Sequence, residues 1–405
     1  MTMLIRNKIK LVLVHILSRA EQWIQLLFFK SKVSYNSYEA PMLNRHVPRL
    51  FNLDLHISVI RDLKYGFRNS KVDITSWSIS GANAQIRRFL RFSDPVKYIN
   101  RKNWQNLNLD LITNFQNEYH NFLKKFDGFI VTYPPTFAEL FLKYEKPILV
   151  DIPIRYETPY SGDTESWNRI NGKFIDKYKE GIITFWANNQ GDVDYFNYHT
   201  GIQPFLVPSK CDYLQAKWCK TRFIKKVVFA KDVDLVKEIG KATNGTWKSS
   251  KEVLGARYNW SDVMDSTYIF YIPYHNSTMQ LFELATAGVP VVVPSKNFLK
   301  KLFFKGFNVL GELTWFQIYN LETSLLNSNN PNNFKSDKFL DWWLARCDFY
   351  DLELMPNVYI VENFDELNTI TLKIDVDILK NQVEIRNSKL DDLRNAYFND
   401  YVSKL

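Results

Sequence analysis

The residues best suited to chemistry lie in one stretch of the second half of the chain, residues 268–293. Asn276, Ser277 and Thr278 stand directly before an apolar run with helical spacing, so we expect them at the N-terminus of a helix. Free backbone amides and the helix dipole attract phosphate at such an end. Glu283 lies on the same predicted helix, within reach of a hydroxylated group held above that site. The stretch therefore predicts a site for a phosphorylated ligand that also carries hydroxyls.

The residues around this stretch predict the elements that hold it. An apolar strand at 268–272 leads into the helix at 278–287, and a second strand follows at 289–293. Gly288 ends the helix, and Pro290 prevents its continuation. A strand–helix–strand unit with no ligand would explain this hydrophobic pattern. It would not explain why Glu283 stands in a helix otherwise made of Leu, Phe and Ala.

This stretch resembles the nucleotide-sugar signature of GT-B glycosyltransferases, in which an acid, seven residues and a Glu precede a Gly-x-Pro turn. His275 and Glu283 have that offset, and Gly288 and Pro290 stand in the expected places. It also resembles the exostosin-type version, in which an aliphatic-Phe-Glu-aliphatic-Ala run precedes the turn. His275 replaces the first acid of the retaining family, so retention of stereochemistry does not carry over.

The resemblance implies a role for each matching residue. Glu283 would bind the ribose hydroxyls of a nucleoside diphosphate-sugar, and Asn276, Ser277 and Thr278 would lie near its diphosphate. His275, in the place of the first acid, would also belong to the donor site. GT-B sites commonly offset the leaving diphosphate with cationic residues and without a metal, so neither a metal nor a cofactor besides the donor is expected. Three further residues are candidates for the donor site, two as cations and one as a nucleobase stacker: Lys231, Arg257 and Tyr258.

A catalytic base for an inverting reaction should come from the first half of the chain. Asp54 and His56 stand at the end of a predicted strand and turn over 51–60, and open α/β sheets bind ligands at strand ends. A His has an ordinary pKa close to neutral pH, which suits removal of a proton from a sugar hydroxyl. Asp54 could orient His56 or replace it. Asp151 and Glu157, at and after another strand end, are the alternative carboxylates.

Alternating strands and helices predict the fold class, an α/β chain with two Rossmann-like domains facing across a cleft. We place an acceptor domain at 36–210, a nucleotide-sugar domain at 211–374, and one long C-terminal helix at 375–405 that crosses back. The predicted strands are the first part of 51–60, which a turn follows, and 72–79, 129–133, 148–152, 181–186, 203–207, 227–230, 268–272 and 289–293. The predicted helices before the last are 107–125, 137–144 with Thr136 as its cap, 188–198, 233–243 and 278–287, and 327–333 is predicted to be a surface loop.

Composition and charge narrow the class of protein. The 405 residues are 46% hydrophobic, which indicates a globular chain, and 52 basic against 43 acidic residues give a net charge of +9, which favours anionic partners. No uncharged apolar run reaches the ~18 residues that a membrane span needs. Three cysteines without a CxxC pair favour a reducing compartment, so we expect a cytoplasmic protein.

The segment 1–35 is basic and contains two short apolar blocks. We expect it to form an amphipathic helix packed on the body of the protein. Its alternative is peripheral contact with an anionic membrane through residues 1–32.

These observations together predict a glycosyltransferase that moves a sugar from a nucleoside diphosphate donor to a hydroxyl of a glycan acceptor. The alternatives are a nucleotide-sugar epimerase or hydrolase of the same fold, and a basic, aromatic-rich protein that binds nucleic acid. The second has no RRM, KH or zinc-finger signature to support it. The Asp-Val-Asp triplets at 192, 232 and 375 stand near predicted helix starts, where Asp is favoured as a cap, so we do not assign them to a metal.

Overall fold

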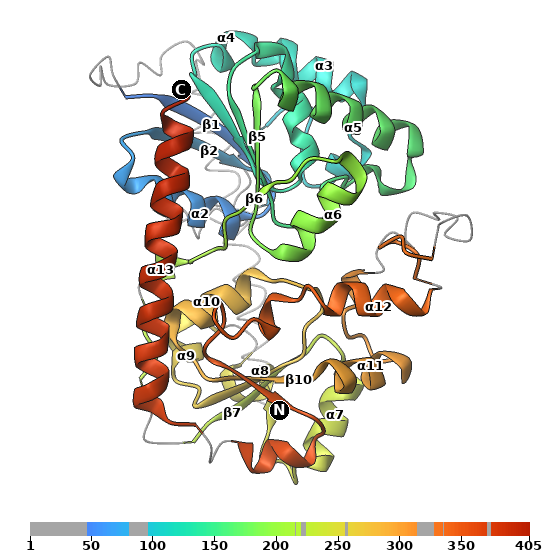
Figure 1. The fold of residues 1–405 in the computed structure, drawn as a ribbon, viewed down its shortest axis with the longest axis vertical. Coiled ribbons are helices and arrows are strands. Elements are labelled where there is room, and N and C mark those ends of the chain that lie inside the picture. The colour runs from blue at the N-terminus through green and yellow to red at the C-terminus, as the bar shows by residue number, and fades with distance from the viewer. Residues whose placement is uncertain are drawn as a thin grey trace, which may run out of the picture. The chain divides into compact units, whose positions relative to one another are not determined.

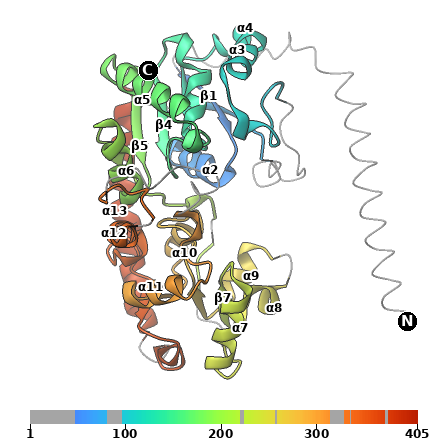
Figure 2. The same ribbon diagram turned by 90° about the vertical axis from the view of Figure 1, so that its right-hand side faces the viewer.

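The computed structural model describes residues 47–80, 96–214, 216–219, 224–255, 258–313, 328–334, 336–370 and 374–405. The predicted N-terminal segment 1–35 therefore lies outside the described residues. All the elements below belong to one compact unit, Pro48–Leu405. Figures 1 and 2 show them in two views.

The first half contains a six-stranded parallel sheet in the order β2-β1-β3-β4-β5-β6. Its strands are β1 Arg49–Asp54, β2 Asp73–Ser78, β3 Gly128–Val131, β4 Ile148–Ile152, β5 Ile183–Ala187 and β6 Phe205–Leu206. Every residue of β3 and β4 is buried, as expected for parallel strands covered on both faces. The helices of this half are α2 Ile57–Gly66, α3 Leu109–Glu118, α4 His120–Leu123, α5 Thr164–Lys179 and α6 Gln190–Thr200.

The second half contains a five-stranded parallel sheet in the order β11-β10-β9-β7-β8. Its strands are β7 Lys226–Phe229, β8 Lys248–Ser249, β9 Tyr268–Tyr271, β10 Val291–Pro294 and β11 Val358–Val361. Its helices are α7 Val233–Ala242, α8 Ser250–Leu254, α9 Trp260–Met264, α10 Met279–Ala287, α11 Lys296–Phe304 and α12 Asp337–Leu344. The α/β fold with two parallel, Rossmann-like sheets that the sequence predicts is confirmed by this topology.

The long C-terminal helix α13, Val376–Val402, passes both sheets (Figure 1). Asp375 caps it by accepting hydrogen bonds from the backbone amides of Asp377 and Ile378. The helix contacts α10 in the second half and α2 in the first. Two buried arginines make the polar contacts, Arg386 with Thr286 Oγ1 at 2.8 Å and Arg394 with Asp62 Oδ2 at 2.8 Å. The predicted terminal helix therefore joins the two halves.

Several local predictions were wrong, each for a local reason. The predicted strand 51–60 ends at Asp54, because the residues after His56 form α2. Thr136 does not cap a helix: it donates a hydrogen bond to the carbonyl of Thr158 at 2.5 Å, and Pro135–Leu140 is a short 3-10 helix. The predicted helix 107–125 is divided into α3 and α4 at Tyr119.

The predicted surface loop at 327–333 is confirmed as a loop over 328–333 and is exposed at Ser328 and Asn329, but its second half is not at the surface. Asn332 and Asn333 are buried, and Asn332 Nδ2 donates to the Tyr195 hydroxyl at 2.7 Å. Helix α5 was not predicted, because it buries only Ile170 and Phe174 in 16 residues and so shows little apolar periodicity. No helix within the described ranges is long and apolar enough to cross a membrane.

The buried Arg394–Asp62 pair gives a test of what joins the halves. Arg394→Ala would leave Asp62 as a buried, uncompensated charge, so we expect it to lower the free energy of unfolding by about 3–5 kcal/mol. Lys404→Ala, which removes a half-exposed pair with Asp400 on the same helix, should cost less than about 0.5 kcal/mol. Denaturant unfolding measures both variants, and equal losses would contradict the assigned role of Arg394.

Candidate functional site

Each sheet has one point at which its chain order reverses. In the first sheet the chain passes from β1 to β2 on one side and returns to β3 on the other side of β1. In the second sheet it passes from β7 to β8 and returns to β9 on the other side of β7. Open α/β sheets bind ligands at such reversals, beyond the carboxyl ends of the strands. The carboxyl ends of β1 and β3, and of β7 and β9, are therefore the places to look for a site.

Asp54 lies at the reversal in the first sheet. It is the last residue of β1 and fully buried, and it accepts a hydrogen bond from the Thr132 hydroxyl directly after β3. Burial raises the pKa of Asp54 to about 7, while hydrogen bonds from Thr132 and from the backbone of Tyr133 and His56 act to lower it. Asp54 therefore fixes the turn that leads to His56 and does not itself reach solvent.

His56 is the group at this reversal that a ligand can reach. It precedes α2, it is exposed, and its ring centroid lies 5.9 Å from that of Tyr133. Although the residue is exposed, desolvation by the protein packed around it lowers its pKa, and the negative charge of Glu312 acts in the opposite direction. A His with a lowered pKa is neutral near pH 7 and can accept a proton.

The two alternative carboxylates lie in separate buried networks. Asp151, in β4, is 3% exposed; burial and nearby Asp62 raise its pKa to about 8, and Arg394 opposes them. Glu157 is 1% exposed and accepts a hydrogen bond from the Tyr195 hydroxyl at 2.8 Å. The structure thus places Asp54 and His56 together and leaves Asp151 and Glu157 apart from them.

Lys231 lies at the reversal in the second sheet. It follows β7, and its Nζ lies 3.5 Å from the centre of the Tyr274 ring, which follows β9. The same ammonium forms an ion pair with Glu312, and both side chains are about half exposed. A cation accessible to a ligand therefore stands where this sheet is expected to bind one.

Glu283 lies on α10 and is 7% exposed. It accepts a hydrogen bond from the hydroxyl of Tyr213. The guanidinium of Arg61 lies over the Tyr213 ring, 4.5 Å from its centre. Burial raises the pKa of Glu283 to about 7, and Tyr213 and Arg61 act to lower it. Partial burial raises the pKa of Tyr258, which is 41% exposed, and the charge of Glu283 acts in the same direction. Glu283 and Tyr258 are thus electrostatic neighbours, and Arg257 lies outside the described residues.

The N-terminus of α10 is covered by protein. Thr278 caps the helix through the Leu281 amide and shares a hydrogen bond of 2.9 Å with the Tyr271 hydroxyl. Asn276 is fully buried, and its Nδ2 donates to Asn189 Oδ1 at 3.0 Å, just before α6. A Cβ on Gly191 would lie 2.2 Å from Asn276 Nδ2, so helix α6 packs directly against the residues predicted to hold phosphate.

His275 and Ser277 are buried in the same contact between α6 and α10. His275 Nδ1 lies 3.2 Å from the Ser277 carbonyl, and burial, with Arg155 nearby, lowers the pKa of His275 to about 3. Ser277 lies beside Asp348, whose pKa burial raises to about 8. The predicted residues therefore meet at one end of α10, but a phosphate can reach them only if α6 moves away.

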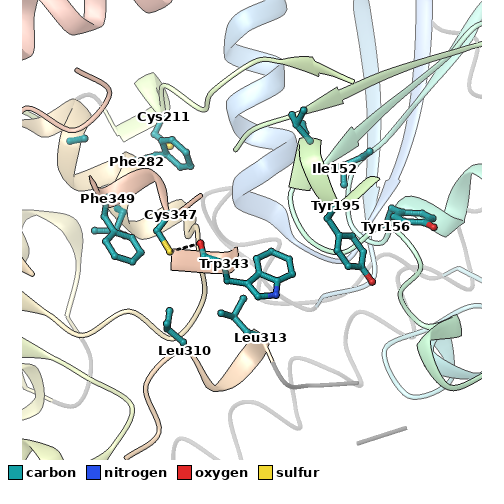
Figure 3. Packing of buried hydrophobic residues seen from close by; sticks show 14 of the residues in the cluster. Ile152, Tyr156, Tyr195, Cys211, Phe282, Leu310, Leu313, Trp343, Cys347 and Phe349 are labelled. Carbon is teal, nitrogen blue, oxygen red and sulfur yellow. Dashed lines mark hydrogen bonds between the residues drawn. The ribbon is translucent and has the colours of Figure 1, made fainter. Parts of the chain in front are cut away.

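Apolar and aromatic side chains fill the rest of the contact between the halves (Figure 3). Trp343 of α12 lies beside Leu313, and its ring centroid is 5.7 Å from that of Tyr195 on α6. The guanidinium of Arg155 lies 4.8 Å from the Trp343 ring and donates to the carbonyl of Leu313. The fully buried Arg155 of the first half therefore contacts Trp343 and Leu313 of the second half.

The Asp-Val-Asp triplets act at helix starts. Asp232 and Asp375 are N-caps of α7 and α13. Asp192 lies in the first turn of α6, where Asn189 donates to its carboxylate at 2.5 Å. Within the part of the chain that the structure describes, no three His, Cys, Asp or Glu side chains gather as a metal would require.

Three residues at the site were not predicted from the sequence. Tyr274 lies three residues after the end of β9, so its place after a strand could have identified it. Tyr213 and Glu312 lie in segments without regular periodicity, and their partners are 70 and 81 residues away in the chain. Nothing in the local pattern indicates those contacts.

Comparison with known proteins adds a set of distant similarities. No protein-family model matches the chain, and no curated protein matches it in sequence. Among solved structures, the glycosyltransferase SnogD from Streptomyces nogalater aligns with a TM-score of 0.46 at 10% identity, over 88% of this chain and 99% of that one. A glycosyltransferase of kitacinnamycin aligns with a TM-score of 0.42 at 10% identity, over 86% and 98%. The spinosyn rhamnosyltransferase SpnG complexed with thymidine diphosphate aligns with a TM-score of 0.33 at 7% identity, over 88% and 96%.

The close packing of α6 on α10 can be tested at Gly191. In Gly191→Ala the new methyl group collides with Asn276, and we expect a loss of about 1–3 kcal/mol in unfolding free energy. Gly240→Ala, inside α7 with nothing within 4 Å of the added Cβ, should instead gain roughly 1 kcal/mol from helix propensity. Thermal denaturation compares the two. A gain in both variants would show that α6 does not press on Asn276.

Proposed function

We propose that the protein transfers a sugar from a nucleoside diphosphate donor to a hydroxyl of a glycan acceptor, with the donor on the second sheet and the acceptor on the first. The observation that carries this proposal is the pairing of functional groups at the two reversals. A half-exposed lysine stands at one, a neutral exposed histidine stands at the other, and Glu312 acts electrostatically on both.

The donor site extends from Lys231 to Glu283. An ionised Glu283 accepts hydrogen bonds from the ribose hydroxyls, the exposed ring of Tyr258 stacks on the nucleobase, and Lys231 offsets the charge of the diphosphate. The amides of α10 join the diphosphate when α6 moves away from Asn276. This set of residues needs no metal to neutralise the leaving group.

The reaction is a single displacement. The acceptor oxygen bonds to the anomeric carbon as the bond from that carbon to the diphosphate breaks, and the diphosphate leaves with the electron pair. His56 takes the acceptor proton, which its lowered pKa allows near neutral pH. Asp54 is a positioning residue in this scheme, because its carboxylate accepts a hydrogen bond from the backbone of His56.

Donor binding is tested first, by calorimetry with UDP, GDP, CMP and dTDP, each with and without Mg²⁺. We expect one diphosphate to bind without metal. Its affinity should rise with pH through about 7, because Glu283 is protonated below that pKa and accepts both ribose hydrogen bonds only when ionised. At pH 8, Glu283→Gln should bind the nucleotide at least roughly tenfold more weakly than the wild type. Its affinity should no longer rise through about pH 7.

Glu238→Gln, at an exposed position of α7, is the control for the change in net charge and should leave binding unchanged. Equal affinity in Glu283→Gln and wild type would remove Glu283 from the donor site. No binding of any of the four nucleotides would overturn the proposed function.

The base is tested by turnover of the donor, followed as release of the nucleoside diphosphate. His56→Gln should lower turnover about 100-fold or more while donor affinity changes less than twofold. The wild-type rate should fall on the acid side with a midpoint below 6.5, where His56 gains a proton, and the variant should lack this step. His120→Gln, which changes a ring stacked on Tyr144 in the first half, should behave as wild type. An unchanged rate in His56→Gln would assign the base to another group.

A further inference from the structure

Glu312 is the acidic residue at the reversal in the second sheet. Its carboxylate pairs with Lys231, and its backbone amide donates to the Tyr274 carbonyl at 3.0 Å. The segment is held on both sides: the amide of Leu310 donates to the Pro273 carbonyl at 2.9 Å, and the amide of Asn308 to Asp232 at 2.8 Å. Backbone contacts therefore fix the segment, and the carboxylate of Glu312 is not needed to hold it.

The Lys231–Glu312 pair is easily exchanged. Both side chains are about half exposed, and exposed pairs contribute only about 0.2–1 kcal/mol. A diphosphate carries more negative charge than one carboxylate, so it displaces Glu312 from Lys231 at little cost. The Tyr274 ring, 3.5 Å from Lys231 Nζ, keeps the ammonium in place during this exchange.

We propose that Glu312 is a positioning residue that holds Lys231 while the donor site is empty and releases it when a diphosphate binds the lysine. The proposal rests on the proposed function, because it assigns the diphosphate to Lys231. The carboxylate of Glu312 therefore competes with the donor for one ammonium group.

The charge of Glu312 acts on Lys231, Tyr271 and Tyr274 in the second half. Burial raises the pKa of Tyr274 to about 12, and the charges of Glu312 and Glu283 act in the same direction. Desolvation lowers the pKa of His56, and the charge of Glu312 opposes it.

The decisive experiment uses Glu312→Gln in the full chain, with calorimetry of the tightest-binding nucleoside diphosphate and of inorganic pyrophosphate. We expect the variant to bind about two- to five-fold more tightly, because Lys231 is already free. A residue that only maintained the loop would weaken binding when changed. Lys231→Met should weaken binding, and adding Glu312→Gln to it should give no further gain.

The matched control is Glu353→Gln, at an exposed position, which should bind the diphosphate as the wild type does. Equal or weaker diphosphate binding in Glu312→Gln would overturn this inference alone, provided that the wild type binds. A wild type that binds no nucleoside diphosphate would overturn the proposed function and this inference together.

Discussion

The arrangement of the two halves depends on one buried ion pair, Asp62 with Arg394. Asp62 Oδ1 accepts from the Cys211 amide at 2.7 Å and Oδ2 from Arg394 at 2.8 Å, and Arg394 also donates to the Pro208 carbonyl at 2.8 Å. Removing two charges from water is costly unless further hydrogen bonds satisfy them. Here those bonds come from the chain that connects the two sheets. The pair therefore joins α2, the connecting chain and α13 at a single point.

The connection fixed in this way carries Tyr213 to Glu283, so the ion pair also determines the nucleoside end of the proposed donor site. Burial raises the pKa of Glu283 and that of Asp151 in β4, and the charge of Asp62 acts in the same direction on both. The charge of Asp62 therefore acts on one buried carboxyl in each half.

The sequence predicted the parts of the fold and of the site that depend on local pattern. The apolar run of β9, the start of a helix next to Thr278 and the turn at Gly288, where φ is +77°, are predicted from neighbouring residues, and all are present. The contacts that complete the site join distant residues: Tyr213 with Glu283 across 70 positions, Asn189 with Asn276 across 87, and Asp62 with Arg394 across 332. Such contacts leave no periodic signal, so the burial of the α10 N-terminus could not be foreseen.

That burial divides the proposed donor site into an accessible and a covered part. Lys231 and Tyr258 are about half exposed, whereas Asn276 is fully buried against Asn189. A donor reaching this protein would first contact the lysine and the tyrosine. The amides of α10 become available only when the hydrogen bond between Asn276 and Asn189 is exchanged for bonds to phosphate. Because α6 belongs to the first half and α10 to the second, that exchange would also change how the half bearing His56 meets the donor.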